Sequence, residues 1–367
     1  MAGSNLAELI GFTPVISPIV ERIKNGVPTD WLPKEFTRVT KRITGATGEY
    51  YRVDGTRETA RRVARGAPAV RMSQKGVTKM AATMISTFHD MMHEEDTLEM
   101  LFSDNSEVKM AGKDEVVRQV GSFYQQIRDL KISAVASALS KGAIYFDGDG
   151  NLLASSSGAA VTIDFGIPAS NKTQLDILGD GSIIDASWNT AATDIVNQVT
   201  KVRQQIAKKC GYIVTEIFYG ANIPKYIAKN TNFANIIKGN SQVANEVKQG
   251  IIPAGTAGFN WHPATDAFFV DADGTTQTWF GDDTIVFTPK VERSWWQYIE
   301  GSKLIPTSLG QVSSDPEAEA KLLKKAFGFF SYATMTQNPV GVQHFAGDTF
   351  LPIIAAPYAV AIGDVTP

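Results

Sequence analysis

Residues 114–141 read DEVVRQVGSFYQQIRDLKISAVASALSK and carry the strongest fold signal in the chain. Apolar side chains recur at helical spacing from Val116 to Leu139, which predicts one continuous helix. Gly142 follows directly, and glycine is a common residue just past a helix end. At 1.5 Å per residue this helix would be roughly 40 Å long, which is unusual for a compact domain.

Outside this helix, the sequence predicts one more long helix and a series of strands. The second helix covers residues 189–210, with a stripe of β-branched residues and Gly211 as its stop. The other expected elements are a hairpin at 143–154, strands at 161–168 and 213–220, a short helix at 223–230, a hairpin followed by a strand within 267–289, and two long strands within 327–365. Because there is no regular βαβ alternation, the predicted fold class is α+β.

Length and composition exclude several classes of protein. The 367 residues amount to about two domains at roughly 150 residues each. A content of 43% apolar and 20% charged residues fits neither disorder nor a collagen-like repeat, and a net charge of −3 argues against a dedicated nucleic-acid binder. Cys210 is the single cysteine, so a disulfide framework and a multi-cysteine zinc site are excluded.

Targeting and membrane signals are not expected. The first 26 residues lack a basic stretch before an unbroken apolar core, and they contain Pro14 and Pro18, which is not typical of a secretory signal. The longest nearly apolar run, residues 351–362, is shorter than the roughly 18 residues that suggest a membrane span. We therefore expect a soluble protein, made in a reducing cytoplasm, with no membrane partner.

Charge is distributed unevenly along the chain. Residues 34–79 contain twelve basic and four acidic residues, a balance of +8, so the rest of the chain carries −11. Residues 90–107 contain seven acidic residues and neither Lys nor Arg. The near-neutral total therefore hides a strongly polarised molecule.

The basic segment has few apolar residues with which to fold. Residues 49–60, EYYRVDGTRETA, indicate β-structure around an Asp-Gly turn. Because a lone two-stranded ribbon is marginally stable in water, it needs a surface from its own chain or from a neighbour. Three interpretations remain open: an arm that lies on a neighbouring subunit, an arm that contacts nucleic-acid phosphates, and a solvated basic loop.

Seven of the nine methionines fall between Met72 and Met110. Met80, Met84, Phe88 and Met91 are expected to share one face of a helix. That face is either ordinary core or a flexible contact surface that packs against unlike partners.

Motifs that carry chemistry are few. His89 and His93 have the i, i+4 spacing of a helical zinc pair, so a metal-dependent hydrolase stays an alternative, although Asp90 stands where the metalloprotease motif has Glu. The DGDGN stretch at 147–151 lacks later ligands of a calcium loop and is interpreted as a hairpin turn. His262 and His344 are expected to be structural, and Trp295 and Trp296 to be buried or at a subunit contact. We expect no catalytic residues, no metal site and no cofactor.

The order of segments resembles the major capsid protein E family of tailed bacteriophages. The likeness rests on RGAPA at 65–69, the helix at 114–141, VTIDFG at 161–166, the helix at 189–210, IFYGAN at 217–222 with IAKN at 227–230, and FLPIIAAP at 350–357. It covers most of the chain.

The resemblance implies the tailed-phage major capsid fold. Residues 1–44 would form an N-terminal arm, 45–85 an extended β-ribbon loop, 86–185 and 326–367 a peripheral domain with a long spine helix, and 186–325 an axial domain. The chain would be a structural protein and not an enzyme. Its hexamers and pentamers would build an icosahedral virion shell around double-stranded DNA, inside the host cytoplasm. The implied partners are a separate scaffolding protein, a portal, a decoration protein and DNA bound without sequence specificity. An encapsulin-like nanocompartment shell is the alternative with the same fold.

Charge and resemblance together suggest an assembly interface. We expect the arginines of the ribbon to dock on a neighbour's acidic segment, and the residues concerned are Arg57, Arg61, Arg62 and Arg65 on one side and Glu94, Glu95, Asp96 and Glu99 on the other. Pairing within one chain is the alternative, because the two segments are close in sequence. Each exposed pair would contribute only ~0.2–1 kcal/mol, so stable docking would need repetition and buried apolar area.

Overall fold

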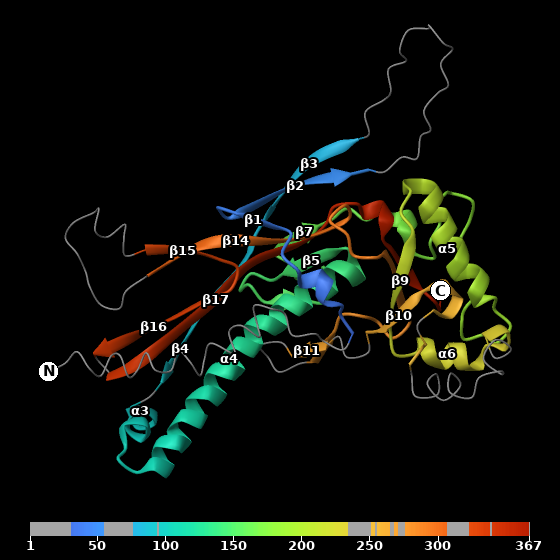
Figure 1. Ribbon diagram of the computed structural model, residues 1–367. Helices are drawn as coiled ribbons and strands as arrows, with labels where there is room; N and C mark the ends of the chain where they lie inside the picture. Colours follow the sequence, from blue (N-terminus) through green and yellow to red (C-terminus); the bar gives the residue numbers. More distant parts are fainter. Residues whose placement is uncertain are drawn as a thin grey trace, which may run out of the picture.

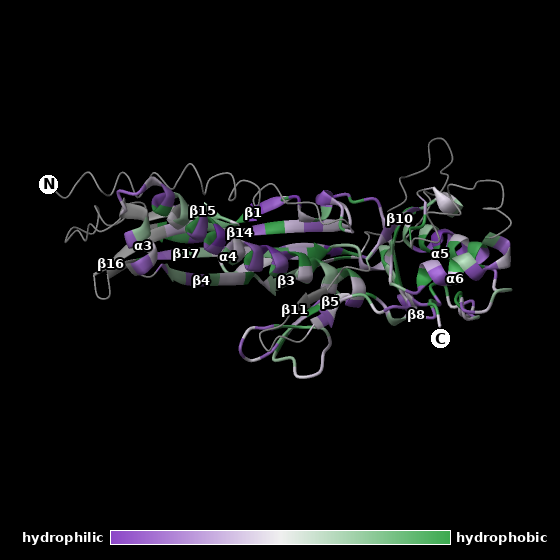
Figure 2. Ribbon diagram, turned by 90° about the horizontal axis from the view of Figure 1, so that it is seen from below, coloured by the Kyte–Doolittle hydropathy of each residue, from purple (hydrophilic) through white to green (hydrophobic). Residues whose placement is uncertain are grey.

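The computed structural model shows an elongated molecule with two groups of elements (Figure 1). In one group a long helix crosses a six-stranded sheet, and in the other two shorter helices accompany a five-stranded sheet. Figure 2 shows the two groups at opposite ends of the molecule in a view turned by 90°. The structure describes residues 31–54, 76–93, 95–233, 251–253, 255–264, 268–270, 276–306, 323–337 and 340–366.

The predicted long helix is α4, Ser106–Lys141. It ends at Gly142 as expected, with a φ of 73° that favours glycine. Its predicted start at residue 114 was wrong, because Asn105 caps the helix eight residues earlier by accepting a hydrogen bond from the Glu107 amide at 3.0 Å. The exposed first turns lack the apolar pattern that defines the rest of the helix. At 36 residues, α4 is about 54 Å long.

Strand β17, Val340–Ile354, is the hub of the six-stranded sheet. It pairs antiparallel with three strands, β14 (Trp296–Pro306), β16 (Phe330–Gln337) and β4 (Ile85–His93). β14 in turn pairs with β1 (Lys41–Ile43) and β15 (Leu323–Phe327). The two long strands expected near the C-terminus, β16 and β17, are therefore confirmed.

The helix expected around Met80, Met84, Phe88 and Met91 was wrong, because this segment forms β3 (Val77–Thr83) and β4. All nine residues of β4 pair with β17, from Ile85 opposite Phe350 to His93 opposite Val342. This pairing partner lies over 250 residues away in the sequence, so local helical spacing could not reveal it. Exposure alternates along β4 as a strand requires, since Thr87 is buried and Phe88 is exposed.

The predicted two-stranded ribbon is present as β2 (Thr47–Val53) paired with β3. The expected Asp-Gly turn was wrong, because Val53 pairs with Val77 and the Asp54 amide donates to the Gly76 carbonyl at 3.1 Å. We call the described strands β2 and β3 the ribbon stem. Residues 55–75, which carry the arginines, lie outside the described part.

The ribbon stem receives one supporting surface from its own chain. Tyr50 is buried, and Gly48 packs closely on Leu351, since a Cβ at Gly48 would lie 2.8 Å from a terminal methyl group of Leu351 and would require that side chain to shift. At the other end of the stem, the Val53 amide donates to the Ala355 carbonyl at 2.9 Å. Both anchors lie at the C-terminal end of β17, which fixes the direction in which the stem leaves the sheet.

The second group contains a five-stranded sheet in the order β10 (Asn260–Pro263), β9 (Val214–Tyr219), β13 (Thr284–Pro289), β18 (Ala361–Asp364) and β8 (Lys172–Thr173). Its helices are α5 (Ile195–Cys210) and α6 (Ile223–Lys229). The predicted start of α5 at residue 189 was wrong, because Asp194 caps the helix by accepting from the Asn197 amide at 3.1 Å. The expected strand at 213–220 and short helix at 223–230 are confirmed as β9 and α6.

The remaining expected hairpins are also present. β5 (Ala143–Phe146) pairs with β6 (Leu152–Leu153) and β7 (Val161–Asp164), and β11 (Phe268–Val270) pairs with β12 (Thr276–Thr278). Asp147 accepts hydrogen bonds from the Asp149 and Asn151 amides, as a turn aspartate does. Short 3₁₀ turns lie at Lys34–Thr37, Ala169–Asn171, Thr256–Gly258 and Pro357–Ala359, and α3 spans Glu95–Phe102.

Three apolar clusters hold these elements together. The main core contains the C-terminal half of α4, from Ala134 to Leu139, together with the fully buried Trp295 and Trp296. A second core lies between the five-stranded sheet and α5. The N-terminal half of α4 contributes to a smaller cluster, which we call the satellite cluster, made of Val116, Val120, Phe123, Tyr124, Ile127, Phe329 and Ala346.

Between the main core and the satellite cluster, a buried ion pair joins α4 to β17. Lys131 Nζ lies 2.6 Å from Asp348 Oδ2, and the Asp348 side chain is fully buried. The ammonium also lies 5.7 Å and 5.8 Å from the ring centres of Tyr298 and Phe350. Removing one partner of such a pair leaves an uncompensated buried charge.

We expect Lys131→Met to lower the free energy of unfolding by about 3–5 kcal/mol, because the buried Asp348 carboxyl group would lose its ion-pair partner. The double variant Lys131→Met with Asp348→Leu should regain most of the loss, since neither charge is then buried. Urea unfolding of the unassembled subunit measures both, with Lys109→Met at an exposed position of α4 as the control. Equal losses for Lys131→Met and Lys109→Met would contradict a structural role for the pair.

Candidate assembly surface

The structure describes only some of the predicted interface residues. Arg57, Arg61, Arg62, Arg65 and Glu94 lie outside the described residues. Glu95 is the first residue of α3, and Asp96 and Glu99 lie exposed on the same helix. The acidic half of the predicted interface is therefore accessible where it is described.

Helix α3 and its neighbours are rich in exposed carboxylates. These lie on β4, on α3 and at the start of α4, and we call them the acidic end: Asp90, Asp96, Glu99, Asp104 and Glu107. No Lys or Arg occurs between residues 90 and 107 to neutralise them. Because like charges repel at short range, this surface favours a cationic partner.

The acidic end and the ribbon stem lie at opposite ends of β4. The stem joins β4 at Ile85, and α3 follows β4 after His93. Nine residues of strand separate the two by about 30 Å at 3.3 Å per residue. The stem extends away from α3, as Figure 1 shows.

A cluster of aromatic side chains, which sequence reasoning missed, lies on the face of the six-stranded sheet opposite α4. Phe88 stacks on Phe345 with ring centres 5.7 Å apart, and Phe345 stacks on Tyr332 at 4.9 Å. Phe330 lies 6.0 Å from Phe88, and Lys303 Nζ lies 4.6 Å from the centre of the Phe88 ring. We call these five residues the aromatic patch. They come from four strands, so no local sequence pattern marks them.

Strand β4 contradicts the alternative in which His89 and His93 bind a metal ion. Residues i and i+4 of a strand are about 13 Å apart, so His89 and His93 cannot bind one metal ion. Instead His93 Nδ1 lies 3.0 Å from Gln119 Oε1 of α4. Among the residues that the structure describes, no group of three or more His, Cys, Asp or Glu could hold a metal ion.

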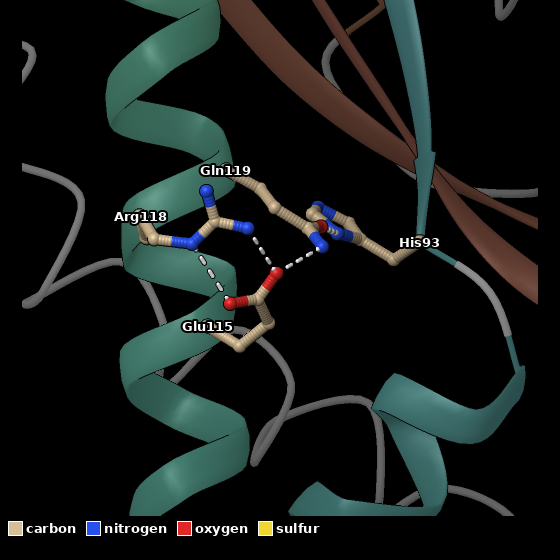
Figure 3. A network of polar contacts seen from close by, with 4 residues as sticks. All are labelled: His93, Glu115, Arg118 and Gln119. Atoms are coloured by element: carbon tan, nitrogen blue, oxygen red, sulfur yellow. Dashed lines mark hydrogen bonds and ion pairs between the residues drawn. The ribbon is translucent and has the colours of Figure 1, made fainter.

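Figure 3 shows the polar network that continues from His93 along α4. Gln119 donates to Glu115 at 2.7 Å, and Arg118 donates to both carboxylate oxygens of Glu115, at 2.9 and 2.6 Å. The hydrogen bonds from Arg118 and Gln119 lower the pKa of Glu115 to about 2. This network orients the Gln119 amide and so joins the end of β4 to the N-terminal half of α4.

The second histidine beneath this half of α4 is His344. Its Nε2 lies 2.6 Å from the Tyr124 hydroxyl and 3.3 Å from the Ser331 hydroxyl. Burial lowers the pKa of His344 to about 4, with a further contribution from His93, whose ring centre is 6.3 Å away. Burial likewise raises the pKa of Tyr124 to about 12, against the hydrogen bond to Ser331. His344 is thus a structural histidine, as expected.

His262 is structural too. Its Nε2 lies 2.7 Å from Glu216 Oε2, and its ring stacks on Phe218 at 4.9 Å. Burial raises the pKa of Glu216, but hydrogen bonds from His262, Asn260 and Thr215 outweigh it, and the net shift is downward. This pair fixes β10 against β9.

We expect acid to destabilise the fold through His344. The folded state keeps the ring neutral down to about pH 4, whereas an unfolded chain binds the proton near pH 6.5. Stability is therefore full above pH 6.5 and falls between pH 6.5 and 4, by about 3 kcal/mol for this shift. Urea unfolding from pH 7 to 4.5 should show a shallower decline for His344→Gln than for the parent or the exposed control His89→Gln. Parallel declines for all three proteins would contradict this assignment.

Most of the chain matches the model of one protein family. The model of the family described as phage major capsid protein E matches residues 15–308. The chain belongs to this family. It is therefore a structural protein of the phage capsid and not an enzyme, it assembles with copies of itself, and its place is the virion.

Several solved structures are similar to this chain. A protein assigned as a prophage capsid protein from E. coli CFT073 has a TM-score of 0.50 at 11% identity, covering 95% of this chain and 98% of that one. The capsid of cyanophage P-SCSP1u gives 0.45 at 9% identity, covering 92% and 89%. The virus-like particle from Pyrococcus furiosus gives 0.40 at 11% identity, covering 95% and 96%. The family match and the prophage protein at a TM-score of 0.50 support the tailed-phage capsid fold for this capsid protein, with α4 as its long helix.

Two further findings complete the comparison. No curated protein matches the capsid protein. Within the described ranges, no helix combines the length and the apolar character needed to cross a membrane.

Proposed function

We propose that this chain is the repeated subunit of a phage head, joined into hexamers and pentamers that build an icosahedral shell around double-stranded DNA. Membership of the capsid family carries the proposal. The ribbon stem supports it, because its outward face is left exposed by its own chain and a shell supplies a neighbour in every position.

The proposed division of the chain follows the family's pattern. Residues 1–44 are the arm, 45–85 the extended loop, 86–185 and 326–367 the peripheral domain, and 186–325 the axial domain. The two domains share strands, since β14 from the axial range pairs with β17 and β18 from the peripheral range pairs with β13. Because strands of one domain pair with strands of the other, the two domains would move together.

In the shell, the arginines of the ribbon dock on the acidic end of a neighbouring copy. The +8 balance of residues 34–79 and the exposure of Asp96 and Glu99 support the pairing itself. The roughly 30 Å of β4 between the stem and the acidic end supports docking between copies rather than within one chain. Exposed ion pairs contribute little singly, so the docking strength would come from repetition around each ring.

Other partners follow from the same role. A separate scaffolding protein, a portal and a decoration protein would act with the shell, and DNA would be enclosed without sequence specificity. Assembly would take place in the host cytoplasm.

Electron microscopy of the purified chain, expressed alone and with a candidate scaffold, tests the proposed function. Uniform closed shells are the expected result. Particles from phage-producing cells should contain nuclease-protected double-stranded DNA. Particles that hold protein cargo and no DNA would support the encapsulin-like alternative, and monomers under every condition would contradict a shell role.

A charge swap tests the docking partners. We expect Arg61→Glu with Arg62→Glu, and separately Asp96→Lys with Glu99→Lys, to abolish shells while leaving the subunits folded, because each variant juxtaposes like charges between copies. A mixture of the two variants should regain hexamers in which they alternate, since each acidic ribbon then meets a basic surface. Closed shells are not expected, because a five-membered ring cannot alternate. Lys201→Glu with Lys208→Glu on α5 is the control for net charge. Normal shells from either variant alone, or no rescue in the mixture, would contradict docking between copies.

A further inference from the structure

Strand β4 has one free edge among the described residues. It pairs with β17 along its whole length, and no other described strand pairs with it. A free edge presents unpaired N–H and C=O groups, and proteins commonly protect such edges with Lys or Pro. The sequence of β4, ISTFHDMMH, contains neither. Within the part of the chain that the structure describes, these nine residues of edge are therefore open to an added strand.

The side chains beside this edge are apolar and accessible. Phe88 is 44% exposed and Met92 37% exposed, on the sheet face that carries the aromatic patch. Asp90 lies between them and accepts a hydrogen bond from Gln343. The edge thus offers backbone hydrogen bonds, an apolar strip and negative charge together.

The ribbon stem has the complementary properties. Its inward face is occupied by Tyr50 and Gly48 against its own sheet, while Tyr51 and Val77 on the outward face are 61% and 54% exposed. Lys79, directly opposite Tyr51 in the register, lies 2.8 Å from Glu49 across the two strands. Each strand of the stem has seven residues, which the nine residues of β4 can accommodate.

We propose that the ribbon stem of one copy adds as a strand to the free edge of β4 on a neighbouring copy, with its outward apolar side chains against the aromatic patch. The proposal rests on the proposed assembly role, and it specifies the backbone and apolar contacts through which the ribbon docks on its neighbour. The stem does not fold back along the free edge of β4 in its own chain, because β3 runs on into β4 through Met84 and the Gly48 and Val53 anchors hold the stem beyond Ile85.

Strand addition makes the contact heterologous: one surface of each copy meets a different surface of the next. Such contacts close into rings when the rotation between copies allows it. Charge agrees with this choice of occupant, because the basic segment 34–79 would lie along the edge that leads to the acidic end. Backbone pairing would supply affinity and the apolar strip would set the register.

Cysteine cross-linking between different chains tests the proposal. In a Cys210→Ser background, chains carrying Tyr51→Cys or Val77→Cys are assembled with chains carrying Phe88→Cys and then oxidised. A disulfide between two singly substituted chains can form only between copies. We expect disulfide-linked dimers with one of the two ribbon variants, which identifies the added strand as β2 or β3. Leu304→Cys, on a residue that is 61% exposed in β14, replaces Phe88→Cys as the control and should give none.

Shells that form without these dimers, or equal dimers with the Leu304 control, would overturn strand addition and leave the capsid role intact. Wild-type chains that never form shells would instead contradict the proposed function. A second measurement covers variants that fail to assemble: amide hydrogen exchange of residues 85–93 in wild-type shells and in free subunits. Slower exchange in shells supports the added strand, and unchanged exchange overturns it.

Discussion

The packing of α4 on β17 is the contact on which the rest of the subunit depends. A helix of about 54 Å is longer than one compact core can cover, so it needs more than one site of attachment. The main core holds its C-terminal half, the satellite cluster holds its N-terminal half, and the Lys131–Asp348 pair lies between them. Because β17 also pairs with β4, β14 and β16, the same strand aligns the helix, the ribbon stem and the start of α3.

This arrangement determines which surfaces are left for other copies. The stem is anchored at Gly48 and Val53, so contacts within its own subunit set its direction, while its outward face stays exposed. At the other end of β4, the polar network from His93 to Arg118 fixes the helix beside the acidic end. The sheet thus holds the ribbon stem at one end of β4 and the acidic end at the other, which suits head-to-tail assembly.

Local signals in the sequence predicted much of the fold. The C-terminal stops of α4 and α5, the hairpin at β5–β6 and the sequence β9–α6 follow from periodicity and from glycine at helix ends. The starts of both helices were misplaced, because single capping side chains, Asn105 and Asp194, determine them. The spacing of apolar residues wrongly predicts a helix at β4, since its alternating burial is set by pairing with β17 far along the chain.

The interface was less accessible to sequence reasoning. Charge counting predicts its acidic half, because like-charged residues cluster locally between 90 and 107. The aromatic patch could not be found in this way: Phe88, Lys303 and Tyr332 meet only after β4, β14 and β16 align beside β17. Gly347 allows the Phe330 ring of this patch to pack on the backbone, since a Cβ there would lie 2.6 Å from the ring.

An electron-microscopy map of assembled shells at side-chain resolution tests the central claim most directly. The account predicts density for the ribbon of each copy along β4 of its neighbour, continuing to Asp96 and Glu99 on α3. A map in which every ribbon contacts only its own chain, with β4 and α3 facing solvent, would contradict it.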